Sequence, residues 1–219
     1  MNTEFLILAL IALIIGIVPL FLVKRDLKIL LIAGGAYFSA IITKEIVQVS
    51  FLHFFQTPQI QTYLAYGILT AVTEPGFAYL FVRFVKQNPQ TYGVSLAFWE
   101  NGFLVGLLGI VSAIALPANY NLTLISPLLN EPLAVVITGR IMDRLSSLFL
   151  HYAWGVSAYL SFWKKDAKFI LTIAPLGFID SLTAYVDLSH INSYFALAVP
   201  AFIAGIIGFL LAKYYLKKA

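Results

Sequence analysis

The chain has 219 residues, of which 61% are hydrophobic and 11% charged, and its mean hydropathy is +0.91. This composition excludes an ordinary soluble globular domain and indicates an integral membrane protein. In a soluble protein the net charge of +4 would suggest nucleic-acid binding. In a membrane protein it reports orientation instead, so no nucleic-acid partner is expected. The absence of cysteine excludes disulfides and thiolate metal sites.

Seven apolar runs follow one another along the chain, each close to or above the about 20 residues that a spanning helix needs. They cover residues 5–23, 29–52, 62–85, 92–115, 133–163, 169–186 and 193–213. The first run is too long for the apolar part of a secretory signal. The sequence therefore predicts an all-α fold, a polytopic membrane helix bundle of seven transmembrane helices. Residues 1–219 would form a single transmembrane domain that contacts the lipid bilayer of the plasma membrane.

The positions of lysine and arginine predict how the bundle is oriented. Eleven of the fourteen fall into the breaks after the first, third and fifth runs and after the seventh. They are Lys24, Arg25, Lys28, Arg83, Lys86, Lys164, Lys165, Lys168, Lys213, Lys217 and Lys218. Because basic residues concentrate on the cytoplasmic side, we expect the N-terminus outside and the C-terminus in the cytoplasm. One of the opposite loops holds the tripeptide NLT at residues 121–123, which fits an N-glycosylation acceptor.

Four ionisable residues lie deep within four consecutive runs. Counted from the nearest basic anchor, Glu74 is twelve residues away, Glu100 fourteen, His151 thirteen and Asp180 twelve. At about 1.5 Å per helical residue, all four share a layer roughly 18–21 Å above the inner boundary. Each would be costly if it faced lipid alone, so we expect them to converge inside the bundle. Such a layer suits a general acid–base site, a metal site or a proton relay.

The neighbouring polar residues have simpler interpretations that stay open. Arg140, Arg144 and His151 share one face of the fifth run, where an arginine could neutralise the acidic layer or bind an anion. Arg140 could instead pair with Asp143 or reach the lipid headgroups. For Lys44, toward the outer end of the second run, a side chain that reaches the headgroups is the simpler interpretation.

Proline and glycine predict local geometry within the runs. Pro75 and Pro175 cannot donate to the preceding helical turn, so we expect kinks close to Glu74 and Asp180. Small residues allow helices to approach closely. We expect close helix contacts at Gly67, Gly76, Gly93, Gly102, Gly106 and Gly177.

Four segments carry a resemblance to a known family. They are EPGFAY from Glu74, VSLAFWEN with Glu100, DRLSSLFLH with Arg144 and His151, and LGFID with Asp180. In spacing they resemble the YhfC-type branch of intramembrane proteases, allied to the PrsW and CAAX-protease (CPBP) groups. The match is incomplete, because the family pattern has other residues at five positions of this chain: Pro75 and Asp143 for Glu, Ala78 for Arg, and Leu96 and Leu176 for His.

The resemblance implies an intramembrane endopeptidase in which water is activated against a peptide bond, with a divalent metal such as zinc as the implied cofactor. It assigns catalytic roles to Glu74, His151 and Arg144, and metal ligation to Glu74, Glu100, His151 and Asp180. The implied partner is a transmembrane peptide substrate.

Two other classes of function stay open at this point. The lost family residues suit a non-catalytic pseudoenzyme, which would act as a subunit beside other membrane subunits or as a scaffold that binds transmembrane helices. Buried carboxylates at mid-depth also occur in ion and proton pathways. Against a pathway, the sequence shows no inverted repeat between its halves and no continuous polar stripe.

Overall fold

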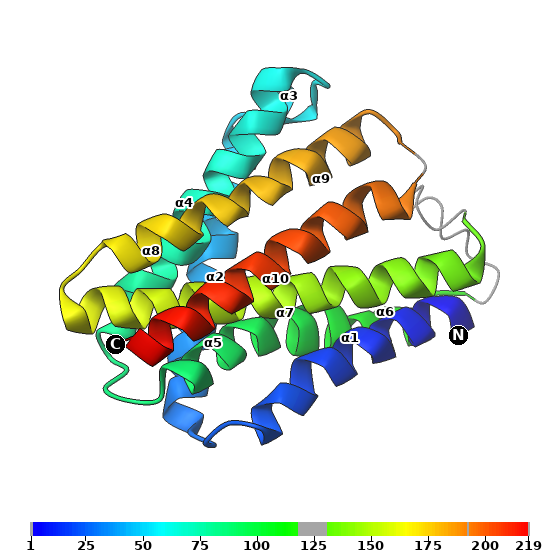
Figure 1. The fold of residues 1–219 in the computed structure, drawn as a ribbon. Coiled ribbons are helices and arrows are strands. Elements are labelled where there is room, and N and C mark those ends of the chain that lie inside the picture. The colour runs from blue at the N-terminus through cyan, green and yellow to red at the C-terminus, as the bar shows by residue number, and fades with distance from the viewer. Residues whose placement is uncertain (1, 118–130, 192, 219) are drawn as a thin grey trace.

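The computed structural model describes residues 2–117, 131–191 and 193–218, and within these ranges every regular element is a helix. The tripeptide at residues 121–123 lies outside the described residues. The helices are α1 Thr3–Phe21, α2 Leu27–Ser50, α3 Leu52–Gln56, α4 Ile60–Val82, α5 Pro89–Ala97, η1 Phe98–Leu107, α6 Leu108–Ala115, α7 Leu133–Lys164, α8 Lys168–Ile173, η4 Ala174–Phe178, α9 Ile179–Leu188 and α10 Tyr194–Lys218 (Figure 1).

Six of these helical stretches are long and apolar enough to cross a membrane. They are α1, α2, α4, the continuous stretch Pro89–Ala115, the stretch Lys168–Leu188 and α10. The remaining predicted span, residues 133–163, forms α7, which has 32 residues but is not among the six. Its charged residues Arg140, Asp143 and Arg144 are tolerated because they form ion pairs with one another and with Glu100. Most of its C-terminal half is enclosed by other helices. A helical multi-pass membrane protein is thus supported, while the count of seven spans and their orientation stay predictions.

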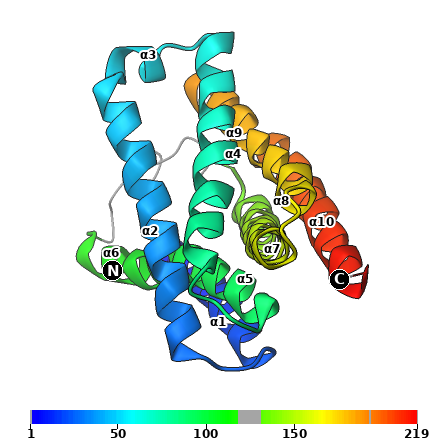
Figure 2. The same ribbon diagram turned by 90° about the vertical axis from the view of Figure 1, so that its left-hand side faces the viewer.

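Helix α7 is the centre of the bundle. Seen almost along its axis, it lies between α4 on one side, α10 on the other and α5 below (Figure 2), and it packs against all three. Small residues permit the tightest of these contacts. A Cβ on Gly155 of α7 would lie 2.5 Å from the Cα of Gly93 in α5, which is closer than atoms can approach. The expected close contact at Gly93 is confirmed, whereas at Gly76 a Cβ would meet nothing within 4 Å and the expectation was wrong.

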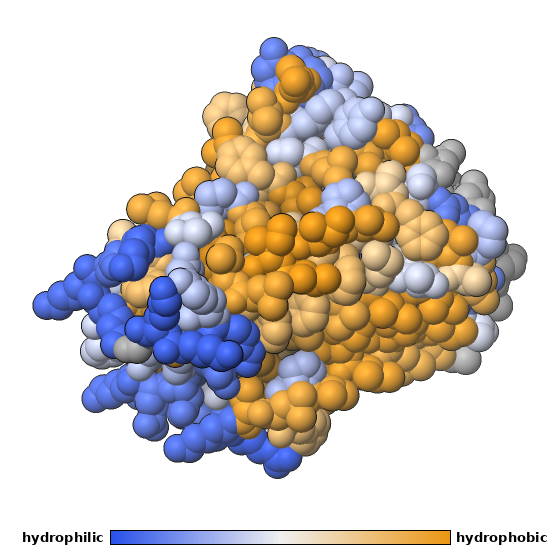
Figure 3. Space-filling model, in the orientation of Figure 1, coloured by the Kyte–Doolittle hydropathy of each residue, from blue (hydrophilic) through white to orange (hydrophobic). Residues whose placement is uncertain are grey.

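The outside of the bundle divides into an apolar surface and a basic end. Large apolar side chains on several helices face outward, including Ile14, Leu31, Val72 and Leu210, each at least 59% exposed. The loops α1–α2, α4–α5 and α7–α8 and the C-terminus all lie at the left and lower left in Figure 1, where hydrophilic residues gather in Figure 3. The four basic groups of the sequence therefore share one end, and the apolar surface suits contact with the bilayer.

Among the helices of the described ranges, two stretches depart from α-helical geometry. η1 is a π-helix that begins two residues before Glu100, and η4 is a 3-10 helix that contains Pro175. The departure at Pro175 agrees with the expected interruption, since proline cannot donate to the preceding turn. α4 instead runs through Pro75 as a single helix. Wide π turns often occur at functional sites, and this one carries an acidic residue of the predicted layer.

Candidate metal centre

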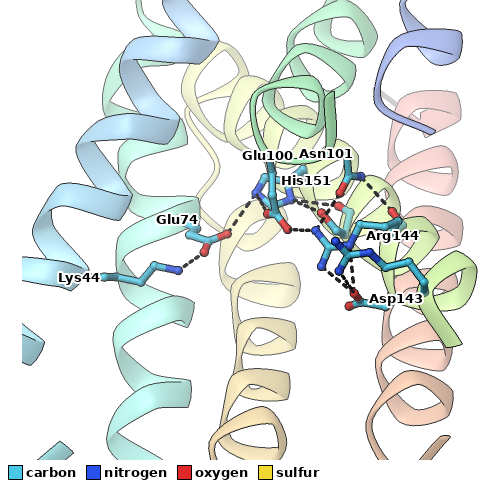
Figure 4. Close-up of polar contacts among 9 residues, drawn as sticks. Lys44, Glu74, Glu100, Asn101, Asp143, Arg144 and His151 are labelled. Atoms are coloured by element: carbon cyan, nitrogen blue, oxygen red, sulfur yellow. Dashed lines mark hydrogen bonds and ion pairs between the residues drawn. The ribbon is translucent and has the colours of Figure 1, made fainter. Parts of the chain in front are cut away.

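Three of the four residues of the predicted layer meet at one point. Glu74 of α4, Glu100 of η1 and His151 of α7 each offer one ligand atom, and these atoms lie within 4.8 Å of one another. Figure 4 shows the two carboxylates approaching the same side of the imidazole from different helices. The expectation that these side chains converge inside the bundle is confirmed for this trio.

The imidazole of His151 is held in one orientation by its own helix. Its Nδ1 lies 2.9 Å from the carbonyl oxygen of Ser147, one turn earlier. Because a carbonyl oxygen can only accept, Nδ1 carries the proton and donates it. In the neutral ring, Nε2 then has a free lone pair. This atom lies 3.2 Å from Oε2 of Glu74 and 3.3 Å from Oε2 of Glu100.

Each glutamate is held by a fixed cation through its other oxygen. Oε1 of Glu74 accepts a hydrogen bond from Nζ of Lys44 in α2. Oε1 of Glu100 lies 2.9 Å from Nη1 of Arg144 in α7. In both residues Oε2 is left facing Nε2 of His151. Outer partners of this kind orient the ligands of metal sites and make one oxygen the available donor.

Arg144 ties the centre to a wider hydrogen-bonded network. Its Nη2 and Nε lie 2.8 and 3.0 Å from Oδ2 of Asp143, and its Nη1 also donates to Oδ1 of Asn101 at 3.1 Å. Asn101, which is 0% exposed, donates back to the carbonyl oxygen of Arg144 at 2.9 Å. Arg140 lies 3.6 Å from Asp143, so the simpler of its two interpretations, the ion pair, is observed. Every donating group of Arg144 described here is thus engaged within the protein.

Asp180 lies apart from the trio. Its Oδ2 accepts a hydrogen bond from the hydroxyl of Thr70 at 2.5 Å, and among the described residues it forms no ion pair. It does line the same cavity as the trio. Asp180 is therefore not part of the ligand group, and its predicted role as a metal ligand has no support from the structure. Its carboxylate remains unpaired beside that group.

The trio forms part of the wall of a polar cavity of about 430 Å³. Besides His151, three cationic and five acidic side chains line this cavity. The cationic ones are Lys44, Arg140 and Arg144, and the acidic ones are Glu74, Glu100, Asp143, Asp180 and Asp187. With a neutral imidazole the formal charge of this lining is −2, which a single divalent cation would balance. An adjoining cavity of about 350 Å³ shares seven of its twelve lining residues with the first, and its other five are Glu45, Gln48, Tyr66, Ala184 and Leu188.

The residues present fit a divalent metal. Nε2 of His151 is buried, and its polar neighbours among the described residues are the two carboxylate oxygens at 3.2 and 3.3 Å, which can only accept when ionised. A lone pair that faces two carboxylate oxygens is electrostatically unfavourable, and either a proton on Nε2 or a bound cation removes the repulsion. Moreover, neighbouring ligand atoms around tetrahedral Zn²⁺ at about 2.0–2.1 Å are themselves about 3.3 Å apart. Both separations from Nε2 match this value.

Several residues of the centre were interpreted wrongly or not singled out from the sequence, and the headgroup interpretation of Lys44 was wrong. Lys44 is the most important, since its side chain turns inward to Glu74 and does not reach the headgroups. Asn101, Tyr37 and Trp154 also contribute, the two aromatic rings lying with their centroids 5.8 and 5.0 Å from that of His151. For Lys44 the available signal was its position within an apolar run, which is costly for any unpaired cation.

Comparison with known proteins adds no family to this description. No family model matches the chain, and neither a curated protein nor a solved structure matches it. The interpretation of the centre therefore depends on its geometry, and the family resemblance stays a proposal.

Proposed function

We propose that this multi-pass protein of the cell membrane is a metal-dependent intramembrane hydrolase that cleaves a peptide bond. The observation that supports the proposal best is the arrangement around His151. Its Nδ1 is fixed by Ser147, and its Nε2 faces one oxygen from each of two glutamates whose other oxygens are held by Lys44 and Arg144.

Glu74, Glu100 and His151 would hold the metal, which leaves room for water on the side of the cavity. A zinc ion with three protein ligands and an open position lowers the pKa of a bound water and polarises a carbonyl group. This three-ligand format is typical of catalytic sites, whereas structural zinc sites are closed by four protein ligands.

The other residues of the chain have supporting roles in this proposal. Lys44 and Arg144 orient the two glutamates, so Arg144 acts as a positioning residue and not as a free anion binder. Asp180, which lines the cavity without an ion pair, would accept a proton from water. The rings of Tyr37 and Trp154 cover the imidazole and limit the access of bulk water.

The substrate class follows from the lining of the cavity and from the resemblance. Beside the charged groups, the wall contains the apolar side chains Ile41, Leu104, Leu150, Ile179 and Leu197. A segment of a transmembrane peptide could place an apolar side chain against these residues and its backbone carbonyl near the metal ligands. The resemblance to the YhfC-type branch points to the same class of substrate.

Metal analysis tests the proposal directly. Protein purified in detergent and exposed to Zn²⁺ should retain about one ion per chain, since three converging donors bind zinc tightly. Glu74→Gln, Glu100→Gln and His151→Ala should each lose it. Lys44→Met should weaken binding about 10–100-fold, the usual cost of removing an outer partner. Asp187→Asn is the control, because Asp187 lines the cavity but lies outside the ligand group.

Activity is tested with the metal-loaded protein in liposomes that contain a fluorogenic transmembrane peptide. Cleavage should disappear with a chelator and in Glu74→Gln, and it should fall strongly in Asp180→Asn while zinc is retained. Stoichiometric zinc without any cleavage would contradict the hydrolase and favour a non-catalytic subunit or scaffold. A folded protein that binds no zinc would overturn the metal centre itself.

A proton pathway is the second candidate, because the two adjoining cavities extend the polar region beyond the trio. On the side of the basic end, however, the core is apolar and tightly packed. Val82, Val85, Tyr92 and Ala158 form part of this cluster, and each is 0% exposed. A polar route would have to cross this layer. Proton flux into liposomes that stops with Glu74→Gln would favour the pathway over the hydrolase.

A further inference from the structure

A second cavity of about 320 Å³, separate from the metal centre, lies at the basic end of the bundle. Its walls come from the end of α1, the loop to α2, the start of α2 and one face of α5. The apolar residues are Ile17, Leu20, Phe21, Val23, Leu27 and Leu30. This volume lies within the range of small-molecule sites, about 300–1,000 Å³. None of its lining residues belongs to the metal centre.

The mouth of this cavity carries positive charge next to exposed apolar side chains. Lys24 and Arg25 line it and are exposed, while the Arg25 guanidinium lies over the ring of Phe21 at 4.8 Å. Phe21 and Leu27 are 62% and 70% exposed. The one acidic lining residue, Asp26, is engaged in capping α2, where it accepts from the backbone N–H of Ile29 at 3.2 Å. This pairing of cations with apolar surface is typical of the level of the lipid headgroups.

One polar group in the wall of the cavity lacks a partner. The hydroxyl of Ser95 is 0% exposed to solvent, lines the cavity and makes no hydrogen bond with any described residue. Thr91 lies one turn earlier on the same face of α5, and its hydroxyl donates to the carbonyl oxygen of Lys24 at 2.9 Å. Ser95 thus lies about 5–6 Å deeper than the residue that anchors the basic loop. An isolated buried hydroxyl costs about 1–3 kcal/mol unless it is satisfied.

We propose that this cavity binds an anionic phospholipid of the leaflet that faces the basic end. Its phosphate would pair with Lys24 and Arg25, and the start of an acyl chain would fill the space between Ile17, Leu20 and Leu30. One ester carbonyl would accept from the hydroxyl of Ser95 after this side chain turns toward the cavity. Along the cavity, cations at the mouth are followed by a hydrogen-bond donor one helical turn deeper and then by apolar walls. This order matches that of phosphate, ester and acyl chain in such a lipid. A zwitterionic lipid fits the walls but not the charge of the mouth.

Native mass spectrometry of the intact protein tests this assignment. The protein, released from detergent micelles, is offered phosphatidylglycerol or phosphatidylcholine with identical acyl chains. One phosphatidylglycerol should be retained per chain, at least tenfold more than phosphatidylcholine. Lys24→Gln combined with Arg25→Gln should remove this preference, since each basic residue near a membrane surface contributes about 1 kcal/mol. Lys217→Gln combined with Lys218→Gln removes the same charge from the same end and should leave the preference intact.

Ser95 provides an independent arm of the test. Ser95→Ala should lower retention of phosphatidylglycerol about fivefold, the usual effect of losing one hydrogen bond. Ser95→Leu, checked for folding by its thermal unfolding midpoint, should abolish retention by filling the cavity. Equal retention of both lipids, an equal loss in the Lys217 and Lys218 control, or full retention in a folded Ser95→Leu protein would each overturn the proposal.

Discussion

The two halves of α7 belong to different environments although they form one continuous helix. Up to His151 the helix carries Arg140, Asp143, Arg144 and Ser147, all of which line the polar cavity. After His151 nearly every residue through Ser161 is buried, and the neighbours are apolar or small. The first half presents charged groups to a space that water or substrate can occupy. The second half fixes the position of the helix by packing.

This difference shows how a charged centre is held at depth in a bundle. The polar half cannot hold itself in place by apolar packing, so its geometry depends on charge pairing and on the rigidity of the packed half. Substitutions in the two halves should therefore differ in kind. In the polar half they should leave unpaired charges, and in the packed half they should displace helices.

The largest effect is expected for Arg144→Met. The substitution leaves Glu100 and Asp143 without their closest cation in a largely enclosed site, and breaking a buried pair in this way costs about 3–5 kcal/mol. Equilibrium unfolding of the protein in mixed micelles would measure the loss. Arg140→Met is the control, because its single ion pair is longer, at 3.6 Å, and its loss should be clearly smaller. Equal losses in the two variants would contradict the central position given to Arg144.

Gly155→Ala should have the next largest effect. Its methyl group would meet the backbone of Gly93, which cannot move aside as a flexible side chain can, so we expect a loss of about 1–3 kcal/mol. Zinc affinity should fall as well, because α5 continues directly into η1, which carries Glu100. Gly76→Ala is the matched control in α4. Its methyl group would meet nothing within 4 Å, and it should be neutral or slightly stabilising. If both variants unfold at the same denaturant concentration, the close approach of α5 and α7 is wrong.

A smaller effect than in these two variants is expected for Tyr92→Phe in the packed region. The buried hydroxyl donates to the carbonyl oxygen of Ala78 at 2.8 Å, and its removal should cost about 0.5–1.5 kcal/mol with no change in zinc binding. Tyr159→Phe loses a similar bond, to the carbonyl oxygen of Lys86, but at an exposed position. Its cost should be smaller still. A change in zinc stoichiometry in either variant would show that the packed region and the metal centre are not separate.

The depth of the candidate site could be predicted from the sequence, because every helical residue adds the same rise. Counting from the basic anchors placed Glu74, Glu100 and His151 in one layer, and the structure brings them together. Rotation about the helix axis could not be predicted in the same way. The π-helical turn that carries Glu100 has a wider period than the count assumes, and no feature of the sequence marks it.

Lys44 is a second residue whose direction about its helix axis could not be predicted from the sequence. Its place near the outer end of the second run suits a side chain that reaches the headgroups, and only the packing of α2 against α4 brings it to Glu74. Asp180 was placed at the right depth but hydrogen-bonds to Thr70 outside the ligand group. For such residues the decisive quantity is which neighbouring helix each one faces, and that depends on tertiary packing.

The bond between Nδ1 of His151 and the carbonyl oxygen of Ser147 limits what the imidazole can do. A histidine that carries protons along a chain must take one at one ring nitrogen and release another at the opposite nitrogen. Here the second nitrogen lies closest to a main-chain acceptor at 2.9 Å, which cannot return a proton, and the hydroxyl of Ser147 is farther away at 3.5 Å. Exchange of protons or electron pairs is therefore confined to Nε2. An imidazole restricted in this way is suited to bind a metal ion through that one nitrogen.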